Sequence, residues 1–394
     1  MKRLFFKKAA LVVSVLFFAC GVAGCKREKD SYTADQKYLY GMDYILFEGL
    51  GNGIDYVKGV QLLNNLGVKS LRHWMHVDWF MDEEFNLKEE NVETMRAMLA
   101  ELKKYDFQII GMNHNNFNYT GMTSAKPPRD TEEGSYYREW LALYEESWYR
   151  LASLFPEITI WEIDNETNNV DFMPSTEGGD FSLSTMTDIS TDMFYYGSKG
   201  VHRANPDATT VMGGFVTWNG EAFLEGVYEN IKSGDFGEGS TDPDDYFQAL
   251  AWHPYTNGFN ADRFVEDNRA LYNIALRYEK KHKTVYFTEL GNWTATQSEE
   301  TAAEYLTQVY KVTAERLPFV ESIHYYRMFD NVIDNNNVSG IFYDPNPDRV
   351  DMTPDGRANP GAPKAAAYAY QRMTGRTGSL ELLMTDLSTL GEKR

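Results

Sequence analysis

The segment Ile158-Thr-Ile-Trp-Glu-Ile-Asp-Asn-Glu166 decides the fold class, because it is an apolar, strand-like run that ends in polar and acidic side chains. Seven further runs of this kind are spread along the chain, at residues 38–47, 68–76, 107–113, 209–216, 247–255, 284–290 and 322–329. Short apolar runs bounded by polar segments are typical of buried strands. The sequence therefore predicts eight strands.

Helix-like segments separate these runs, at residues 56–66, 89–105, 136–154, 187–205, 220–232, 261–282 and 298–317, and a final one at 363–373 completes the series. Pro206 directly follows the fourth segment and fits a helix stop. Alternating strands and helices are typical of parallel α/β proteins. Residues 49–53 lack the G-x-G-x-x-G spacing of an open nucleotide-binding sheet, so we expect a plain loop there.

Eight strand–helix units in 394 residues fit a closed ring better than an open sheet. We therefore predict a single (β/α)8 TIM barrel over residues 34–376, with 377–394 as a C-terminal tail. The hydrophobic fraction of 43% is sufficient for a large core. The aromatic fraction of 14% is consistent with core packing and equally with a site where sugar faces stack on rings.

The N-terminus predicts export. Basic residues at positions 2, 3, 7 and 8 precede a short apolar run at 9–19, which is too short to span a membrane. Val22-Ala-Gly-Cys25 then resembles the lipobox of bacterial lipoproteins. The resemblance implies a signal peptide over 1–24, a lipidated Cys25, a tether over 25–33, and an anchor in the bacterial envelope, with the outer membrane as the expected location. An ordinary signal peptide is the alternative.

Charge and cysteine content exclude several classes of protein. The formal net charge is −20, and removal of the basic signal makes the mature chain more acidic. Such a surface argues against nucleic acid and anionic lipid as partners. Cys20 and Cys25 are the two cysteines, and Cys20 lies in the removed part, so the mature chain has no disulfide and no thiol nucleophile. We expect no cofactor.

The chemistry of a TIM barrel lies at the C-terminal ends of its strands. Glu166 ends the fourth run and Glu289 lies near the end of the seventh. Retaining glycoside hydrolysis needs two carboxyl groups about 5–5.5 Å apart, one protonated and one ionised. Arg72 and Tyr255, near the ends of the second and sixth runs, are candidates to hold Glu289 ionised, and Asn165 can offer an amide to a substrate hydroxyl.

These residues resemble the clan of retaining (β/α)8 glycosidases, and glycoside hydrolase family 39 and its relatives in particular, over residues 38–375. By this resemblance Glu166 is the acid/base and Glu289 the nucleophile, Tyr255 hydrogen-bonds the nucleophile, and Asn165 binds the sugar 2-hydroxyl. The matching pieces are Arg72, Trp161-Glu162, Asn165-Glu166, His253-Pro254-Tyr255, Thr288-Glu289-Leu290-Gly291, Tyr325-Tyr326-Arg327 and Pro363-Lys364.

Two residues depart from the family pattern. Asp164 stands where the family usually has Trp, and Thr167 where it usually has Pro. Alternation along a strand would place Glu162, Asp164 and Glu166 on one face, so Asp164 would either raise the pKa of Glu166 or bind substrate. The two departures do not change the predicted reaction type, but they leave the subfamily and the identity of the sugar open.

Further strand-end residues are candidates for binding substrate, with packing as the alternative role; they are His114, His253, Trp218, Trp293 and Tyr326. His73 and His76 form no metal-ligand spacing such as H-E-x-x-H, so we expect no catalytic metal. Two acidic loops, at 235–245 and 344–351, are interpreted as solvated loops in preference to calcium sites.

The sequence thus predicts a retaining glycoside hydrolase that cleaves β-glycosidic bonds of an oligosaccharide or polysaccharide. Alternatives from the same clan are an endo-acting glycanase, an α-L-arabinofuranosidase, or an enzyme that transfers the sugar to an acceptor other than water. The alternative from another class is a non-catalytic glycan-binding lipoprotein.

Overall fold

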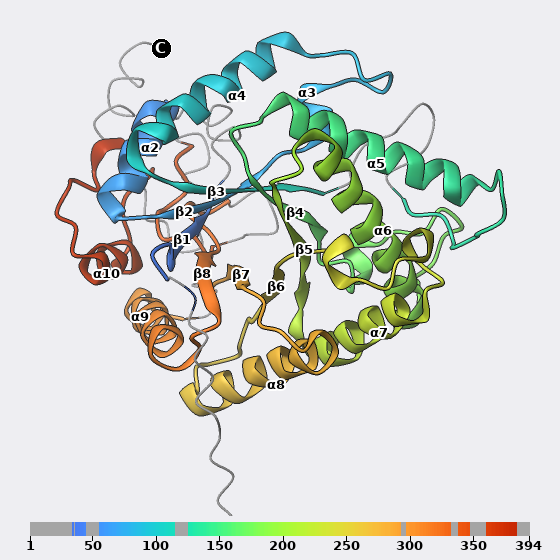
Figure 1. Cartoon of the computed structure of the whole chain (residues 1–394). Helices are drawn as coiled ribbons and strands as arrows, with labels where there is room; N and C mark the ends of the chain where they lie inside the picture. Colours follow the sequence, from blue (N-terminus) through green and yellow to red (C-terminus); the bar gives the residue numbers. More distant parts are fainter. Residues whose placement is uncertain are drawn as a thin grey trace, which may run out of the picture. The chain divides into compact units, whose positions relative to one another are not determined.

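A closed barrel of eight parallel strands forms the centre of the protein (Figure 1). The computed structural model describes residues 34, 36–44, 55–114, 125–292, 297–331, 338–346 and 360–383. Each strand pairs with its neighbour in the chain, and β1 pairs with β8 to close the ring. The strands are β1 (Tyr40–Asp43), β2 (Ser70–Trp74), β3 (Gln108–Asn113), β4 (Ile160–Asn165), β5 (Thr209–Val216), β6 (Leu250–His253), β7 (Val285–Leu290) and β8 (Val320–Tyr325). The predicted single (β/α)8 barrel is confirmed.

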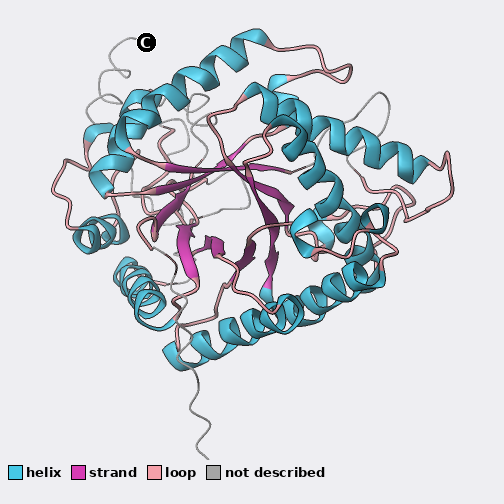
Figure 2. Cartoon of the chain, in the orientation of Figure 1, coloured by secondary structure: helices cyan, strands magenta, loops and turns pink. Residues whose placement is uncertain are grey.

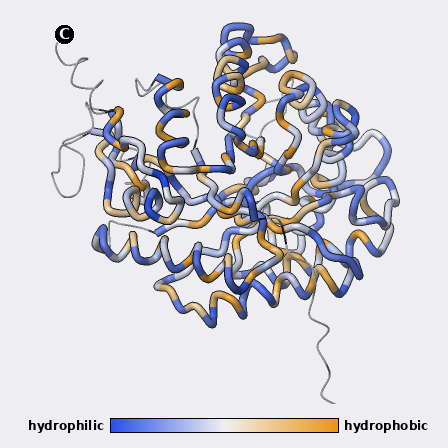
Figure 3. Tube along the Cα trace, turned by 60° about the vertical axis from the view of Figure 1, so that its left-hand side comes forward, coloured by the Kyte–Doolittle hydropathy of each residue, from blue (hydrophilic) through white to orange (hydrophobic). Residues whose placement is uncertain are grey.

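Helices surround this barrel (Figure 2). Polar and apolar residues alternate along them, as expected for helices with one face against the strands (Figure 3). Among the described residues they are α2 (Tyr56–Leu66), α3 (Val77–Phe80), α4 (Glu89–Leu102), α5 (Tyr136–Leu154), α6 (Leu183–Ala204), α7 (Gly220–Ser233), α8 (Ala261–Glu279), α9 (Glu299–Arg316) and α10 (Ala365–Thr374). No helix in the described ranges has both the length and the apolarity needed to cross a membrane.

Several boundaries differ from the sequence-based prediction, for identifiable reasons. Helix α6 begins four residues early, at Leu183, because Ser182 caps it by accepting from the N–H of Thr185. Strand β6 is shorter than residues 247–255, since the N–H of Tyr255 donates to the carbonyl of His253 and turns the chain. Strand β8 ends at Tyr325, four residues short of the predicted end.

The core divides into two parts. Between the strands and helices, the rings of Trp140, Tyr144, Trp148 and Trp161 contact one another in series and join α5 to β4. Inside the barrel, a second cluster fills the part nearer the N-terminal ends of the strands; it comprises Ile110, Val211, Ala249, Ala251 and Tyr286. Polar side chains occupy the C-terminal ends, which leaves that end for chemistry.

Several predictions fall on residues outside the described ranges. Cys25, the lipobox and the loop at 49–53 lie outside the described residues, and so does Trp293. Of the predicted C-terminal tail, residues 377–383 are described. Leu380 and Leu383 are buried, and Asn65 on α2 donates to the carbonyl of Ser379.

Candidate active site

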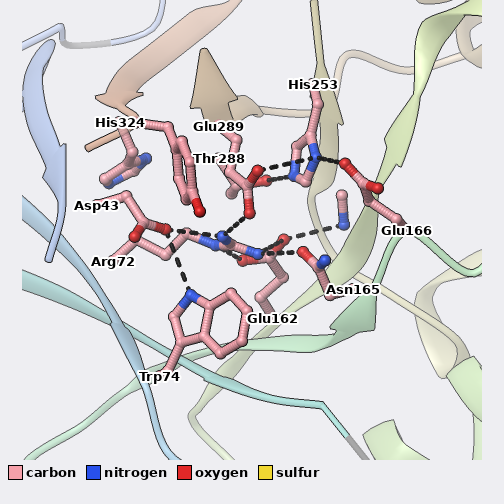
Figure 4. A network of polar contacts seen from close by, with 12 residues as sticks. Asp43, Arg72, Trp74, Glu162, Asn165, Glu166, His253, Thr288, Glu289 and His324 are labelled. Atoms are coloured by element: carbon pink, nitrogen blue, oxygen red, sulfur yellow. Dashed lines mark hydrogen bonds and ion pairs between the residues drawn. The ribbon is translucent and has the colours of Figure 1, made fainter. Parts of the chain in front are cut away.

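Arg72 on β2 lies at the centre of the polar network, fully buried (Figure 4). Its Nε donates to Oε2 of Glu162 at 2.6 Å, and its Nη2 donates to Oδ1 of Asn165 at 2.6 Å. Its Nη1 donates both to Oδ2 of Asp43 at 2.8 Å and to Oε1 of Glu289 at 2.6 Å. Because the guanidinium is a rigid planar fork, it fixes the relative positions of side chains from β1, β4 and β7.

Glu289, the residue before the last of β7, receives a hydrogen bond on each oxygen. Arg72 donates to Oε1, and the hydroxyl of Tyr255 donates to Oε2 at 3.0 Å. Burial raises the pKa of this carboxyl, but the positive charges of His253 and Arg72 and the two hydrogen bonds outweigh it, so the pKa is below its ordinary value. Glu289 is therefore held ionised. The structure brings Arg72 and Tyr255 to Glu289 as the sequence suggested.

Glu166 directly follows β4 and faces Glu289 across His253 (Figure 4). Its Oε1 lies 2.7 Å from Nδ1 of His253, and its Oε2 accepts from the amide of Asn169 at 3.0 Å. One oxygen of Glu166, one ring nitrogen of His253 and one oxygen of Glu289 all lie within 4.8 Å of one another. The two glutamates from distant parts of the sequence thus form one pair.

His253, the last residue of β6, is buried between the two glutamates. Its Nδ1 also lies 3.6 Å from Glu289, and its Nε2 lies 3.1 Å from the hydroxyl of Thr288. Burial lowers the pKa of His253, but the charge of Glu289 and the contact with Glu166 raise it above its ordinary value. Predicted as a substrate-binding residue, His253 contacts the carboxylates. Gly214 makes room for it, since a Cβ there would overlap the imidazole and Thr288.

The side chain of Asp164 points away from this pair. Its φ of 70° breaks the alternation of β4, so Glu162 and Asn165, three residues apart, both contact Arg72. The expectation of a face shared by Glu162, Asp164 and Glu166 is therefore wrong. The carboxylate of Asp164 is fully buried and accepts from the N–H of Asn165 at 2.8 Å.

The partners of Asp164 come from outside the glutamate pair. Its Oδ1 lies 2.7 Å from Nδ1 of His114, and its Oδ2 accepts from the hydroxyl of Tyr144 at 3.3 Å. Burial raises the pKa of Asp164, but Lys126 and His114 lower it to a net value below the ordinary one. His114 was predicted to bind substrate. In the structure it contacts the carboxylate of Asp164 and the ring of Phe172.

The remaining predicted residues are more scattered. Trp218 lies on the turn after β5 and is 72% exposed. Tyr326 directly follows β8, and burial raises its pKa to about 12. Sequence reasoning missed Asp43 and Trp74, the last residues of β1 and β2. The position of Asp43 could have identified it, but the first run was drawn to residue 47, which placed Asp43 inside the strand.

The glutamate pair and His253 also have a spacing at which a metal ion could bind. Glu289, however, already accepts hydrogen bonds from two donors, one of them the positively charged Arg72. A cation in the same place would be repelled by the guanidinium and would compete with both donors. The donor set is therefore better suited to an ionised carboxylate than to a metal ligand.

Solved structures of (β/α)8 glycoside hydrolases match the fold of this chain. A family 39 glycoside hydrolase from the gut symbiont Bacteroides cellulosilyticus WH2 matches with a TM-score of 0.59 at 15% identity, over 87% of this chain and 64% of its own. The chain thus spans less than two thirds of that relative.

Two further matches cover nearly all of their own chains. A GH5-4 broad-specificity endoglucanase from Clostridium longisporum matches with a TM-score of 0.60 at 13% identity, over 87% of this chain and 97% of its own. A psychrophilic family 10 endo-β-1,4-xylanase matches with a TM-score of 0.55 at 12% identity, over 85% and 96%. No protein-family profile and no curated protein matches the sequence. At these identities the likeness concerns the fold.

Proposed function

We propose that this protein is a retaining glycosidase that hydrolyses β-linked glycosides. The observation that carries the proposal is the pair of buried glutamates: one oxygen of each, together with one nitrogen of His253, lie within 4.8 Å of one another. Retaining enzymes place their carboxyl groups about 5–5.5 Å apart, whereas inverting enzymes leave about 6.5–9.5 Å for a water molecule. The short approach supports direct attack on the sugar by one of the two carboxylates.

The surroundings of the two glutamates support different roles for them in this proposal. Glu289, held ionised by Arg72 and Tyr255, attacks the anomeric carbon as the bond to the leaving oxygen breaks. Glu166 gives its proton to that oxygen. In the second step Glu166 takes a proton from water, the resulting hydroxide attacks the anomeric carbon, and the bond to Glu289 breaks. The free sugar leaves, and both glutamates return to their starting states.

A substrate screen tests this proposal. Full-length protein in mild detergent would be incubated with aryl β-xyloside, β-glucoside, β-galactoside and α-L-arabinofuranoside, and with a set of polysaccharides. We expect the wild type to release sugar and Glu289→Gln to lose at least about 1000-fold in kcat. Proton NMR of the first-formed product should show retained configuration. Full activity in Glu289→Gln would refute the assignment of the nucleophile.

The acid/base is tested separately from the nucleophile. Glu166→Gln should lose about 100- to 10,000-fold on substrates whose leaving group needs protonation. Its kcat/KM, which reports the first step, should fall far less on dinitrophenyl glycosides, because their leaving group departs without a proton. A uniform loss on both kinds of substrate would contradict the role of Glu166.

The other outcomes of the screen select among the alternatives. Oligosaccharides released from one polymer, with no aryl glycoside cleaved, would indicate an endo-acting glycanase. Release from the arabinofuranoside alone would indicate an arabinofuranosidase. Binding without turnover would support a glycan-binding protein. Activity that EDTA abolishes and added metal restores would assign the glutamate–histidine cluster to a cation.

We also propose that the chain is exported and anchored to the outer membrane through Cys25, because its N-terminus resembles a lipoprotein signal. The expected partners are a carbohydrate and the membrane, and not nucleic acid, given the net charge of −20. Metabolic labelling with an alkyne fatty acid should modify the wild type and not Cys25→Ala. Equal labelling of both would contradict the anchor.

A further inference from the structure

Asp43, the last residue of β1, is a third carboxylate beside the glutamate pair. Its side chain is 3% exposed, and both of its hydrogen bonds end on Oδ2. Arg72 donates to that oxygen at 2.8 Å, and the indole N–H of Trp74 donates at 3.4 Å. Within the described part of the chain, no donor contacts Oδ1. This oxygen is therefore available to accept a hydrogen bond from a ligand.

The position of Asp43 indicates what that partner is. Nη1 of Arg72 contacts both Asp43 and Glu289, so the two carboxylates flank one nitrogen. Figure 4 shows Asp43 and Glu166 on opposite sides of Arg72. Glu166, as the acid, marks the side of the leaving group. Asp43 therefore faces the side of the sugar ring that is remote from the scissile bond.

The charge of Asp43 fits an acceptor. Burial raises the pKa of its carboxyl, and the attraction of Arg72 partly offsets this, so the pKa is about 6. At neutral pH Asp43 is mainly ionised. An ionised carboxylate that is shielded from water accepts a strong hydrogen bond from a hydroxyl group.

We propose that Asp43 is a substrate-binding residue whose Oδ1 accepts a hydrogen bond from the C3 or C4 hydroxyl of the sugar attacked by Glu289. The inference rests on the proposed function and deepens it. It selects sugars with a free hydroxyl at the contacted carbon, and it selects against sugars substituted there. Trp74 and Arg72 hold the carboxylate for this contact through their bonds to Oδ2.

Deoxygenated substrates provide the test. The aryl glycoside that the wild type cleaves fastest would be compared with its 2-, 3- and 4-deoxy analogues in the wild type, Asp43→Ala and Asp43→Asn. In the wild type, loss of the contacted hydroxyl should lower kcat/KM by about 10- to 100-fold. Asp43→Ala should lose that discrimination at C3 or C4 and keep the wild-type penalty for the 2-deoxy analogue. Unchanged penalties at both C3 and C4 would overturn the proposal.

Asp330 offers a matched control. It is also a buried aspartate paired with one cation, Lys364, and it lies outside the contacts of Arg72. Asp330→Asn should keep the wild-type ratio between hydroxylated and deoxy substrates whatever its effect on folding. If thermal unfolding shows that Asp43→Ala does not fold, Asp43→Asn keeps the test open. It conserves shape and one oxygen, and it should show the same pattern at smaller amplitude.

A binding measurement separates this inference from the proposed function. Calorimetry would compare Glu289→Gln with the double variant Glu289→Gln/Asp43→Ala against oligosaccharides of the same panel. One outcome is that the wild type hydrolyses no substrate, while Glu289→Gln binds a glycan at least about 10-fold more tightly than the double variant. In that case the role of Asp43 in binding is supported and the proposed function fails. Equal binding by the two variants overturns the proposed role of Asp43. No binding to any glycan by either variant overturns both.

Discussion

At the scale of single residues, the conformation of Asp164 explains how β4 delivers both Asn165 and Glu166 to the site. A φ of 70° is unfavourable for most residues, but Asp tolerates it because its carboxylate can bond to a neighbouring N–H. Here the carboxylate accepts from the N–H of Asn165. Asp164 therefore shapes the backbone that presents Asn165 and Glu166.

We expect Asp164→Ala to lower the free energy of unfolding by about 3 kcal/mol, because it leaves buried Lys126 and His114 without their anion. Asp164→Asn should be milder, since the amide oxygen still accepts from Asn165. Both variants should lower kcat more than they raise KM, because Glu166 is misplaced. Urea unfolding and steady-state kinetics measure these effects. An Asp164→Ala variant with wild-type stability and kcat would contradict this account.

Part of the site was predictable from sequence, but the directions of individual side chains were not. Glu166, Glu289, Arg72 and Tyr255 stand at strand ends, where a barrel displays its chemistry, and the structure brings them together. The direction of the Asp164 side chain was not predictable, because alternation along a strand fails at a positive φ. His253 was assigned to the substrate for a similar reason, since a strand-end position does not reveal which neighbour a ring contacts.

At the scale of elements, the contact between α5 and α6 depends on a glycine. A Cβ on Gly200 would overlap the carbonyl oxygen of Glu145 and lie 2.9 Å from Cβ of Trp148. Helix propensity favours alanine by about 1 kcal/mol, but here two helix backbones approach closely. Sequence periodicity predicted both helices and gave no indication of this distance, which depends on packing in three dimensions.

We therefore expect Gly200→Ala to destabilise the protein by about 1–3 kcal/mol in spite of its better helix propensity. The matched control is Gly226→Ala on α7, where the nearest atom to a Cβ would be the side-chain methyl of Thr187 at 2.9 Å. That variant should stay within about 1 kcal/mol of the wild type. Chemical unfolding of both variants checks this, and a Gly200→Ala protein as stable as the control would show that α5 and α6 can separate freely.

At the scale of the whole molecule, strand order and class were predictable because eight runs alternate with helices. The exact ends of the strands and helices were less predictable from sequence, since a strand stops where its neighbours stop pairing. The pH dependence of stability also belongs to this scale. His253 has a folded pKa above its ordinary value of 6.5, so its stabilising contribution is complete below pH 6.5 and is lost as the pH rises through the folded pKa.

His253→Gln should therefore flatten the fall in unfolding free energy on the alkaline side of pH 6.5. His73 is the control of opposite sign, because burial lowers its pKa to about 4. Its contribution is present above pH 6.5 and is lost as the pH falls toward 4, so His73→Gln should alter the acid side. Urea titrations between pH 4 and 9 measure both. Parallel curves for His253→Gln and the wild type would show that His253 is not the group concerned.

The closure of the ring between β1 and β8 has a consequence for synthesis. Gly41 pairs with His324, and Arg72 meets Glu289 across 217 residues of sequence. A nascent chain emerging from the ribosome therefore carries Arg72 long before its partner exists, and its first strand has no second neighbour until the last strand appears. The contact between Arg72 and Glu289 can therefore form only late in synthesis, and a chain that terminates before Glu289 lacks it.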